Sequence, residues 1–329
     1  MPPDRQPSRL NLTGIVSAAL GIALFVWYVR RIGAAEIWDG LRSVGWGFLP
    51  IIAVAGVRFA LRAWALTICL EPASRPRFRT VFAGVLAGDA IGNLTPLGLI
   101  ASEPTKAAFI RSGGSIGPAI AAVAVETLIY TLSVAGMIAA TTIALVHSFD
   151  LSAEMRRAAW IAIAVITSGF VATAILVWRQ PVIVGRLLST VAAGSRMQEV
   201  IATLHDLEQQ IFSFASRRRD AIVPVVAAEI TFHILGVLEI ALTLWLILGA
   251  RPPLLTAFIL EGANRLVQVV FKPVPLRAGV DEITTGTFTR LLGYGVTLGA
   301  TMAIVRKVRT IFWVLMGTLL LVRRGVARN

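Results

Sequence analysis

The sequence predicts an all-α integral membrane protein, with about six membrane-spanning helices and two re-entrant helical hairpins in an inverted-topology internal repeat. Three observations lead to this fold class. Of the 329 residues, 56% are hydrophobic and only 15% are charged, whereas soluble domains carry roughly 25% charged residues. Several apolar runs reach the length of about 20 residues that a helix needs to cross the hydrocarbon core. Two further apolar regions are broken by proline and glycine and share a sequence pattern.

The composition also excludes several classes of function. The formal net charge is +13, but Lys and Arg collect in the cytoplasmic loops of membrane proteins, and the sequence contains no soluble basic domain that would bind nucleic acid. Cys69 is the only cysteine, so neither an intrachain disulfide nor a cysteine metal cluster is expected. We expect no metal and no cofactor.

Six apolar segments predict the spanning helices. The first, residues 10–29, lacks a convincing cleavage site and is expected to remain as a transmembrane helix. The other predicted spans are 46–70, 117–146, 157–178, 221–248 and 295–322. The stretch 179–220 is arginine-rich, contains no span and has apolar residues at three- and four-residue intervals, which predicts a cytoplasmic amphipathic connector, either interfacial or docked on the bundle. The whole chain, 1–329, is expected to form a single transmembrane domain.

Two interrupted regions, about 79–112 and 254–292, predict the re-entrant hairpins. Proline removes a backbone donor, and clusters of glycine and proline break helices. A broken helix persists in a bilayer only where its backbone is buried in protein or lines a wet cavity. We therefore expect each region to enter the membrane and return to the same side. The residues expected to form the breaks are Asn93, Pro96, Pro273, Pro275 and Gly279.

The distribution of arginine predicts the orientation. A cytoplasmic N-terminus also places residues 71–79, 179–220 and the C-terminal tail in the cytoplasm, and these segments hold most of the arginines outside the spans. Because cytoplasmic loops are the positive ones, we expect a multi-pass protein of the cell membrane with both termini cytoplasmic. This count requires each interrupted region to return to its own side.

The interrupted regions are related by an internal repeat. The pattern Pro-x6-Glu-x-Thr-x3-Phe-x-Arg-x2-Gly begins at Pro96 and recurs, without a gap, 179 residues later at Pro275. The repeat halves are about 79–146 and 254–322. With the predicted orientation, the two hairpins open to opposite sides, which is an inverted-topology repeat. Many transporters use this architecture to place a substrate site between broken helices near the midplane.

Ionisable residues within the predicted spans and hairpins are the candidate site residues, because such residues are costly in a bilayer and usually face a bundle interior or cavity. Arginine forks bind phosphate and carboxylate groups, so arginines that face a cavity are expected to hold an anionic headgroup. Glu103 and Glu282, related by the repeat, are expected to neutralise these arginines or to cap a half-helix. The candidates for lipid binding are Arg58, Arg62, Glu103, Arg111, Glu126, Glu282, Arg290, Arg306 and Arg309. Ion pairs that only fix helix packing are the alternative for each.

Other charged residues lie in the same apolar surroundings. Asp89 and Lys106 belong to the first interrupted region, and Glu239 belongs to the span 221–248. In that span Glu229 and His233 are one helical turn apart and share a face. A proton relay and a satisfied buried histidine are both compatible with this spacing.

The stretches 88–126 and 274–306 resemble the flippase-like transmembrane domain of lysylphosphatidylglycerol synthases and related stand-alone membrane proteins. That family shows an Asn-Leu segment before a Pro, a Gly-Glu pair, an Arg and a later Glu-Arg, then a Pro-rich turn, a glycine cluster and a Glu. The counterparts are Asn93, Leu94, Pro96, Glu103, Arg111, Glu126, Pro273, Pro275, Gly279 and Glu282, with Arg306 in the last helix. The chain departs from the pattern at Ser102, where Gly is usual, and at Thr127, where Arg is usual, and it keeps only Gly279 of the glycine cluster. The resemblance implies a domain that translocates an aminoacylated phospholipid, a glycolipid or a hopanoid-type lipid.

We therefore predict a flippase-like membrane lipid transporter that moves or handles an anionic or polyprenyl/hopanoid-type lipid. Two alternatives stay open. One is a non-catalytic scaffold subunit of a lipid-modifying or glycosyltransferase system, which would have a lipid-biosynthesis enzyme as partner. The other is a proton-coupled transporter of a small solute that uses Glu229, His233 or Glu126. Enzymatic activity is not expected, because the sequence contains no recognisable catalytic motif and no aminoacyl-transfer domain.

Overall fold

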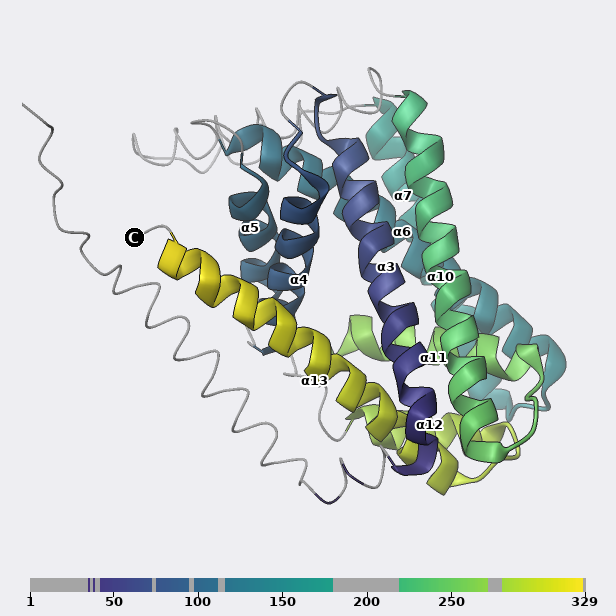
Figure 1. Cartoon of the computed structure of the whole chain (residues 1–329). Coiled ribbons are helices and arrows are strands. Elements are labelled where there is room, and N and C mark those ends of the chain that lie inside the picture. Colours follow the sequence, from purple (N-terminus) through teal and green to yellow (C-terminus); the bar gives the residue numbers. More distant parts are fainter. Residues whose placement is uncertain are drawn as a thin grey trace, which may run out of the picture.

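The computed structural model describes residues 35, 38, 42–72, 75–94, 98–111, 116–179, 219–271 and 280–327, and every regular element in these ranges is a helix (Figure 1). A short 3-10 turn, η1 (Gly45–Gly47), precedes the first long helix. The α-helices are α3 (Phe48–Cys69), α4 (Phe78–Leu94), α5 (Gly98–Ile110), α6 (Gly117–Ser148), α7 (Ala153–Arg179), α10 (Arg219–Leu248), α11 (Leu254–Val270), α12 (Val280–Leu291) and α13 (Val296–Ala327). The prediction of an all-helical protein is confirmed for the described residues.

Four helices are long and apolar enough to cross a membrane. They are Arg42–Cys69, Gly117–Ser148, Ala153–Thr173 and Asp220–Leu248, and they match four of the six predicted spans. The predicted span 295–322 is observed as the 32-residue helix α13, whose apolar sequence is interrupted in the middle by Arg306, Lys307 and Arg309. The predicted span 10–29 and nearly all of the predicted connector 179–220 lie outside the described residues. The described helices are those of a multi-pass membrane protein.

Each interrupted region forms two short helices instead of one long helix. The 17-residue α4 packs along the 13-residue α5, and the 17-residue α11 contacts the 12-residue α12. All four are shorter than the roughly 20 residues that span a bilayer. The close approach of α4 to α5 requires Gly88, because a Cβ there would lie 2.6 Å from Lys106 Cγ. The two breaks fall at residues 95–97 and 272–279, which hold Pro96, Pro273, Pro275 and Gly279 and are outside the described residues.

Helices from the two halves of the chain pack against one another. The first-hairpin helix α4 contacts α13, and the second-hairpin helix α11 contacts α6. Each hairpin is therefore flanked by the long helix that follows the other one. The helices that precede the hairpins, α3 and α10, also pack together. In Figure 1, α4 and α5 lie in the upper part of the bundle and α11 and α12 in the lower part.

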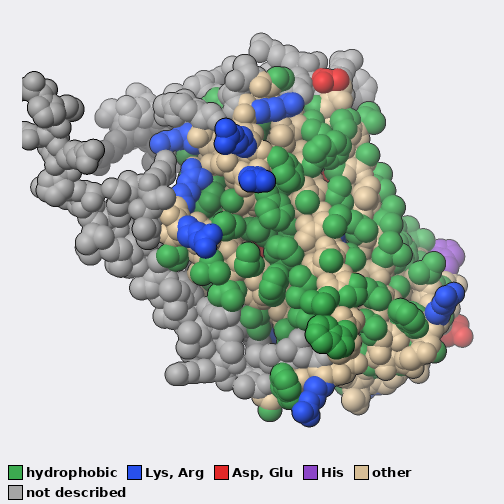
Figure 2. Space-filling view, in the orientation of Figure 1, with side chains coloured by type: hydrophobic (Ala, Val, Ile, Leu, Met, Phe, Trp, Pro, Cys, Tyr) green, Lys and Arg blue, Asp and Glu red, His purple; other side chains and the backbone are tan. Residues whose placement is uncertain are grey.

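The outer surface is apolar. The most apolar stretch of α7 has no buried residue, and Trp160, Ile161 and Val165 are exposed on it. Figure 2 shows hydrophobic side chains over most of the visible face, with Lys and Arg gathered toward its upper edge. Apolar surface of this extent requires lipid as its solvent.

Candidate functional site

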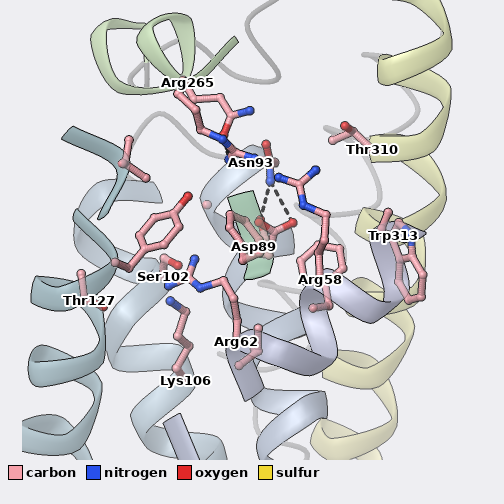
Figure 3. Close-up of a pocket in the computed structure, with 18 of the residues that line it drawn as sticks. Arg58, Arg62, Asp89, Asn93, Ser102, Lys106, Thr127, Arg265, Thr310 and Trp313 are labelled. Atoms are coloured by element: carbon pink, nitrogen blue, oxygen red, sulfur yellow. Dashed lines mark hydrogen bonds between the residues drawn. The ribbon is translucent and has the colours of Figure 1, made fainter. Parts of the chain in front are cut away.

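Polar side chains from both halves of the bundle meet around a cavity of about 430 Å³. Its lining residues come from α3, α4, α5, α6, α10, α11 and α13. In Figure 3, Arg58, Arg62 and Lys106 extend toward the region around Asp89, and Arg265 and Thr310 approach it from other helices. Pockets of about this size hold small molecules or headgroup-sized parts of larger ones.

Cations dominate the charged part of the cavity lining. Arg58, Arg62, Lys106, Arg265 and Arg309 line the cavity, together with two carboxylates, Asp89 and Glu103. Three further carboxylates pair with these arginines but do not line the cavity: Glu126, Glu239 and Glu261. The wall thus presents cationic groups to the cavity, and carboxylates outside the lining neutralise them.

Arg58 is held in this way by two carboxylates. Its Nη1 donates to Glu239 Oε2 at 2.8 Å and its Nη2 to Glu261 Oε1 at 3.2 Å. The guanidinium carbon lies 4.4 Å from the centre of the Phe232 ring, which adds a cation–π contact. Arg58 Nε is buried without a hydrogen-bond partner among the described residues. Two carboxylates and one ring therefore fix the orientation of the Arg58 guanidinium.

Arg62, one turn further along α3, is held by Glu126 of α6. Arg62 Nε and Nη2 both donate to Glu126 Oε1, at 2.9 and 2.6 Å. Its guanidinium carbon lies 3.7 Å from the centre of the Tyr130 ring. Both bonds use one carboxylate oxygen, and Arg62 remains partly accessible while Glu126 is only 1% exposed. Arg62 therefore keeps donor capacity on its cavity side.

Arg265 and Arg309 share the carboxylates that hold Arg58. Arg265 Nε donates to Glu261 Oε1 at 2.8 Å, and Arg309 pairs with Glu239. Glu239 and Glu261 therefore each bridge two arginines from different helices, α3 with α13 and α3 with α11. This arrangement links both halves of the chain through the cavity wall.

The first hairpin supplies the acidic part of the lining. Asp89 Oδ2 accepts a hydrogen bond from Asn93 Nδ2 at 3.0 Å, one turn along α4. Both oxygens of Glu103 accept from Lys106 Nζ at 3.0 Å, and Thr127 Oγ1 donates to Glu103 Oε2 at 3.0 Å. Glu103 thus pairs with a lysine, instead of an arginine as the sequence suggested. The position where the resembling family usually has Arg, here Thr127, is used to hold Glu103.

A glycine makes room for the bridged arginines. At Gly236 of α10, a Cβ would contact Glu261 Oε1 and would lie 3.1 Å from Arg58 Nη2. Any larger residue at this position displaces the ion pair between α3 and α11. Gly236 is therefore part of the site although it carries no side chain.

Part of the cavity lining is apolar. The apolar residues are Ala55, Phe59, Val85, Val134, Phe232, Val269 and Trp313. Uncharged polar side chains complete the lining: Asn93, Ser102, Thr127, Tyr130, Thr131, Gln268 and Thr310. The cavity is consequently amphipathic, with a charged part and an oily part, which suits a ligand that has both.

A second charged cluster joins α12 to α13, outside the cavity lining. Arg306 Nη1 donates to Asp281 Oδ1 at 2.7 Å and approaches Thr285 Oγ1 at 3.4 Å. Lys307 pairs with Glu282. Asp281, Arg306 and Lys307 are buried, so this cluster is a closed contact between the second hairpin and the helix that follows it.

The residues predicted from the sequence fall into four groups. Arg58, Arg62, Asn93, Glu103 and Arg309 line the cavity, and Glu126 lies behind its wall. Glu282 and Arg306 belong to the α12–α13 cluster. Arg111 and Arg290 are exposed and do not line the cavity. Pro96, Pro273, Pro275 and Gly279 lie outside the described residues.

Two charged residues of the site were missed by the sequence reasoning. Glu261 and Arg265 are one turn apart in the apolar sequence of α11, 1% and 3% exposed. The spacing criterion that singled out Arg58 and Arg62 would have found them. Both residues precede the break in the second interrupted region, whereas the repeat pattern covers the residues that follow it.

Comparison with known proteins gives one family. The family model described as "Lysylphosphatidylglycerol synthase TM region" matches residues 14–317. No curated protein matches the chain, and no solved structure does.

Proposed function

We propose that the protein is a membrane lipid transporter. The chain belongs to the lysylphosphatidylglycerol synthase TM region family, and it encloses a cation-lined cavity. The cavity receives the anionic headgroup of the lipid during transbilayer movement. Membership in the family supports a membrane protein related to lipid handling, and the cavity supplies the chemistry. The protein acts by binding and conformational change, without catalysis.

The observation that carries this proposal is the set of arginines in the cavity wall. Arg58, Arg62, Arg265 and Arg309 come from three helices and line one cavity. Guanidinium groups bind phosphate through paired hydrogen bonds. Their carboxylate partners lie behind them, which fixes their orientation before a ligand binds. Donors positioned in advance reduce the ordering cost of binding.

The apolar lining favours a lipid over a hydrophilic solute. Phe59, Phe232 and Trp313 line the cavity beside the arginines. A glycerol backbone and the first acyl carbons would contact these rings while the phosphate contacts the guanidiniums. A soluble phosphate ester would make only the contact between phosphate and guanidinium. It is the alternative ligand that carries the same anionic group.

The packing of the two halves supports a transport mechanism based on an inverted repeat. Exchange of α3, α4, α5 and α6 with α10, α11, α12 and α13 reproduces the main helix contacts, including α4 with α13 and α11 with α6. In transporters with this symmetry, the two halves exchange roles between states. The first hairpin borders the cavity, whereas the second is closed onto α13 by Asp281–Arg306 and Glu282–Lys307. We propose that lipid movement opens the second contact as the first closes.

The test is lipid movement in vesicles. The protein is reconstituted in phosphatidylcholine vesicles with tail-labelled phosphatidylglycerol, and the fraction of label accessible to dithionite is followed over time. We expect faster movement of the anionic probe than in empty vesicles. Arg265→Gln and Arg309→Gln should slow it by about tenfold or more, as the loss of one charged hydrogen bond does. In each variant the partner carboxylate keeps its bond to Arg58, so the bundle remains neutralised.

Arg290→Gln is the matched control, because Arg290 is exposed and lies outside the cavity. It should leave the rate unchanged. Movement no faster than in empty vesicles, for several anionic lipids, contradicts the proposal. Uptake of radiolabelled glycerol 3-phosphate without lipid movement identifies a solute transporter instead. A stable co-purifying enzyme, with no transport of either kind, identifies a scaffold subunit.

A further inference from the structure

One buried acid beside the cavity has no partner. Glu229 of α10 is 1% exposed, and neither of its carboxyl oxygens has a hydrogen-bond partner among the described residues. Every carboxylate of the cavity wall, in contrast, is paired with arginine or lysine, or accepts from an amide. An ionised carboxylate without donors is very costly in such surroundings, whereas the neutral acid is much less so.

The surroundings of Glu229 contain fewer cations than carboxyl groups that need them. The charged or titratable groups that act on it are Arg62 of α3, Lys106 of α5, and Glu126 and Tyr130 of α6. Arg62 is bonded to Glu126 and Lys106 to Glu103. Two carboxyl groups that share one guanidinium do not both ionise readily. Glu229, the group without a bond, is therefore the one that most readily exchanges a proton when the charge around it changes.

His233 lies one turn further along α10 and has an acceptor nitrogen without a partner among the described residues. Ser133 Oγ donates its only hydrogen to the Tyr130 carbonyl at 2.8 Å, so at 3.0 Å it accepts from His233 Nε2. This assigns the hydrogen of a neutral ring to Nε2. His233 Nδ1 is then a free acceptor, and it has no partner among the described residues. The charges that act on this ring are Arg58 and Arg62 of α3.

We propose that Glu229, one turn from His233, is a proton-binding site linked to headgroup binding at Arg62. The inference rests on the proposed function, since it assigns a coupling ion to the same cavity. An anionic headgroup that bonds to Arg62 adds negative charge beside Glu229, and a proton bound there offsets that charge. The proton that forms the O–H bond on Glu229 comes from the aqueous phase when the lipid binds, and it returns there when the lipid is released.

The test measures how headgroup binding depends on pH. Binding of a short-chain phosphatidylglycerol to the protein in nanodiscs is titrated calorimetrically between about pH 5.5 and 8.5, the range in which histidine-linked sites exchange protons. Coupling to one proton weakens binding by up to about tenfold for each unit of rising pH. Repetition in buffers of different ionisation enthalpy counts the protons taken up with the ligand.

In Glu229→Gln, the side chain has the shape of the protonated acid and cannot ionise. This variant should bind the probe with no pH dependence and no proton uptake. Glu154→Gln, which changes an exposed carboxyl of α7, should behave as the wild type.

Wild-type binding without proton uptake, or a pH dependence that persists in Glu229→Gln, overturns the inference and leaves the transport function standing. If Glu229→Gln does not bind, Glu229→Asp must restore binding together with its pH dependence; its failure assigns Glu229 a structural role and overturns the inference. A wild-type protein that binds no anionic probe at any pH refutes the proposed function and this inference with it.

Discussion

At the scale of single residues, the site is organised by carboxylates that serve two arginines each. Glu239 joins Arg58 to Arg309, and Glu261 joins Arg58 to Arg265. A buried pair that loses one member leaves an uncompensated charge, whereas a bridged set can lose one cation and keep its acid satisfied. The bridges therefore give the cavity wall tolerance to the movement of any one arginine toward a ligand.

The space for these bridges depends on Gly236, which gives a direct prediction. Gly236→Ala places a methyl group against Glu261 Oε1 and Arg58 Nη2. We expect the free energy of unfolding to fall by about 1–3 kcal/mol, as in other overpacked interiors, and lipid movement to slow. Gly169→Ala is the control, since a Cβ at Gly169 meets nothing within 4 Å. Unfolding in detergent, followed for both variants, checks this. Equal stability of the two contradicts the proposed crowding at Gly236.

The sequence pointed to some of the charged residues in the cavity wall but not to their pairing. Arg58 and Arg62 were predicted because two arginines one turn apart inside an apolar run require a polar neighbour. Their partners Glu239 and Glu261 lie 181 and 203 residues away, and such pairings depend on helix packing that no local pattern contains. Arg111 and Arg290 matched the repeat pattern, but both are exposed: Arg111 follows the last residue of α5, and Arg290 lies in the last turn of α12.

At the scale of elements, the two pairs of short helices differ in what they contact. The first contributes Asp89, Asn93, Glu103 and Lys106 to the cavity. The second is closed onto α13 by buried ion pairs. Because α4 packs on α13 and α11 on α6, each pair of short helices is in contact with the long helix of the other half, as the proposed mechanism requires.

This arrangement predicts that the α12–α13 contact opens when its acids are neutralised. In a Cys69→Ala background, Asp281→Asn with Glu282→Gln removes both ion pairs to α13. We expect Thr285→Cys, now 5% exposed on the face toward Arg306, to react at least about fivefold faster with a water-soluble maleimide, the lower end of typical coupling between sites. Thr287→Cys, on the exposed face of α12, should react equally fast in both backgrounds. An unchanged rate at Thr285→Cys shows that the ion pairs do not hold α12 closed.

Element boundaries followed from the sequence wherever glycine and proline occur together. The structure ends α4 at Leu94 and begins α5 at Gly98, and it separates α11 from α12 between Val270 and Val280. A single proline was a weaker signal, because α5 continues through Pro104 and α10 through Pro224. Pro104 is exposed, and a lone missing donor in a helix is more easily accommodated than a cluster of breaks.

At the scale of the whole molecule, charge is unequally distributed between the two ends of the bundle. The end that holds the start of α4 carries Arg75, Arg77 and Arg79, and the C-terminal part of α13 reaches the same end, where Arg324 donates to the carbonyls of Ala108 and Phe109 in the last turn of α5. The opposite end carries Arg42 before α3, Arg156 and Arg157 at the start of α7, and Arg251 between α10 and α11. The positive end is the cytoplasmic one in the proposed orientation.

Cysteine labelling of intact cells tests this orientation. In a Cys69→Ala background, Arg156→Cys should react with a membrane-impermeant maleimide added outside, because its end of the bundle faces outward. Arg77→Cys should react only after the cells are permeabilised. Both positions are exposed, so access to the reagent depends on the side of the membrane. The reverse pattern contradicts the proposed orientation while leaving the cavity unaffected.

The central claim is that the arginine-lined cavity holds the phosphate of a lipid, and a structure of the protein in nanodiscs of anionic lipid tests it most directly. We expect density for a phosphate within about 3 Å of guanidinium nitrogens from at least two of Arg58, Arg62, Arg265 and Arg309, with acyl density leading toward Phe59 and Trp313. A cavity in which Asp89 or Glu103 has closed onto the arginines, with no headgroup between them, would contradict the claim.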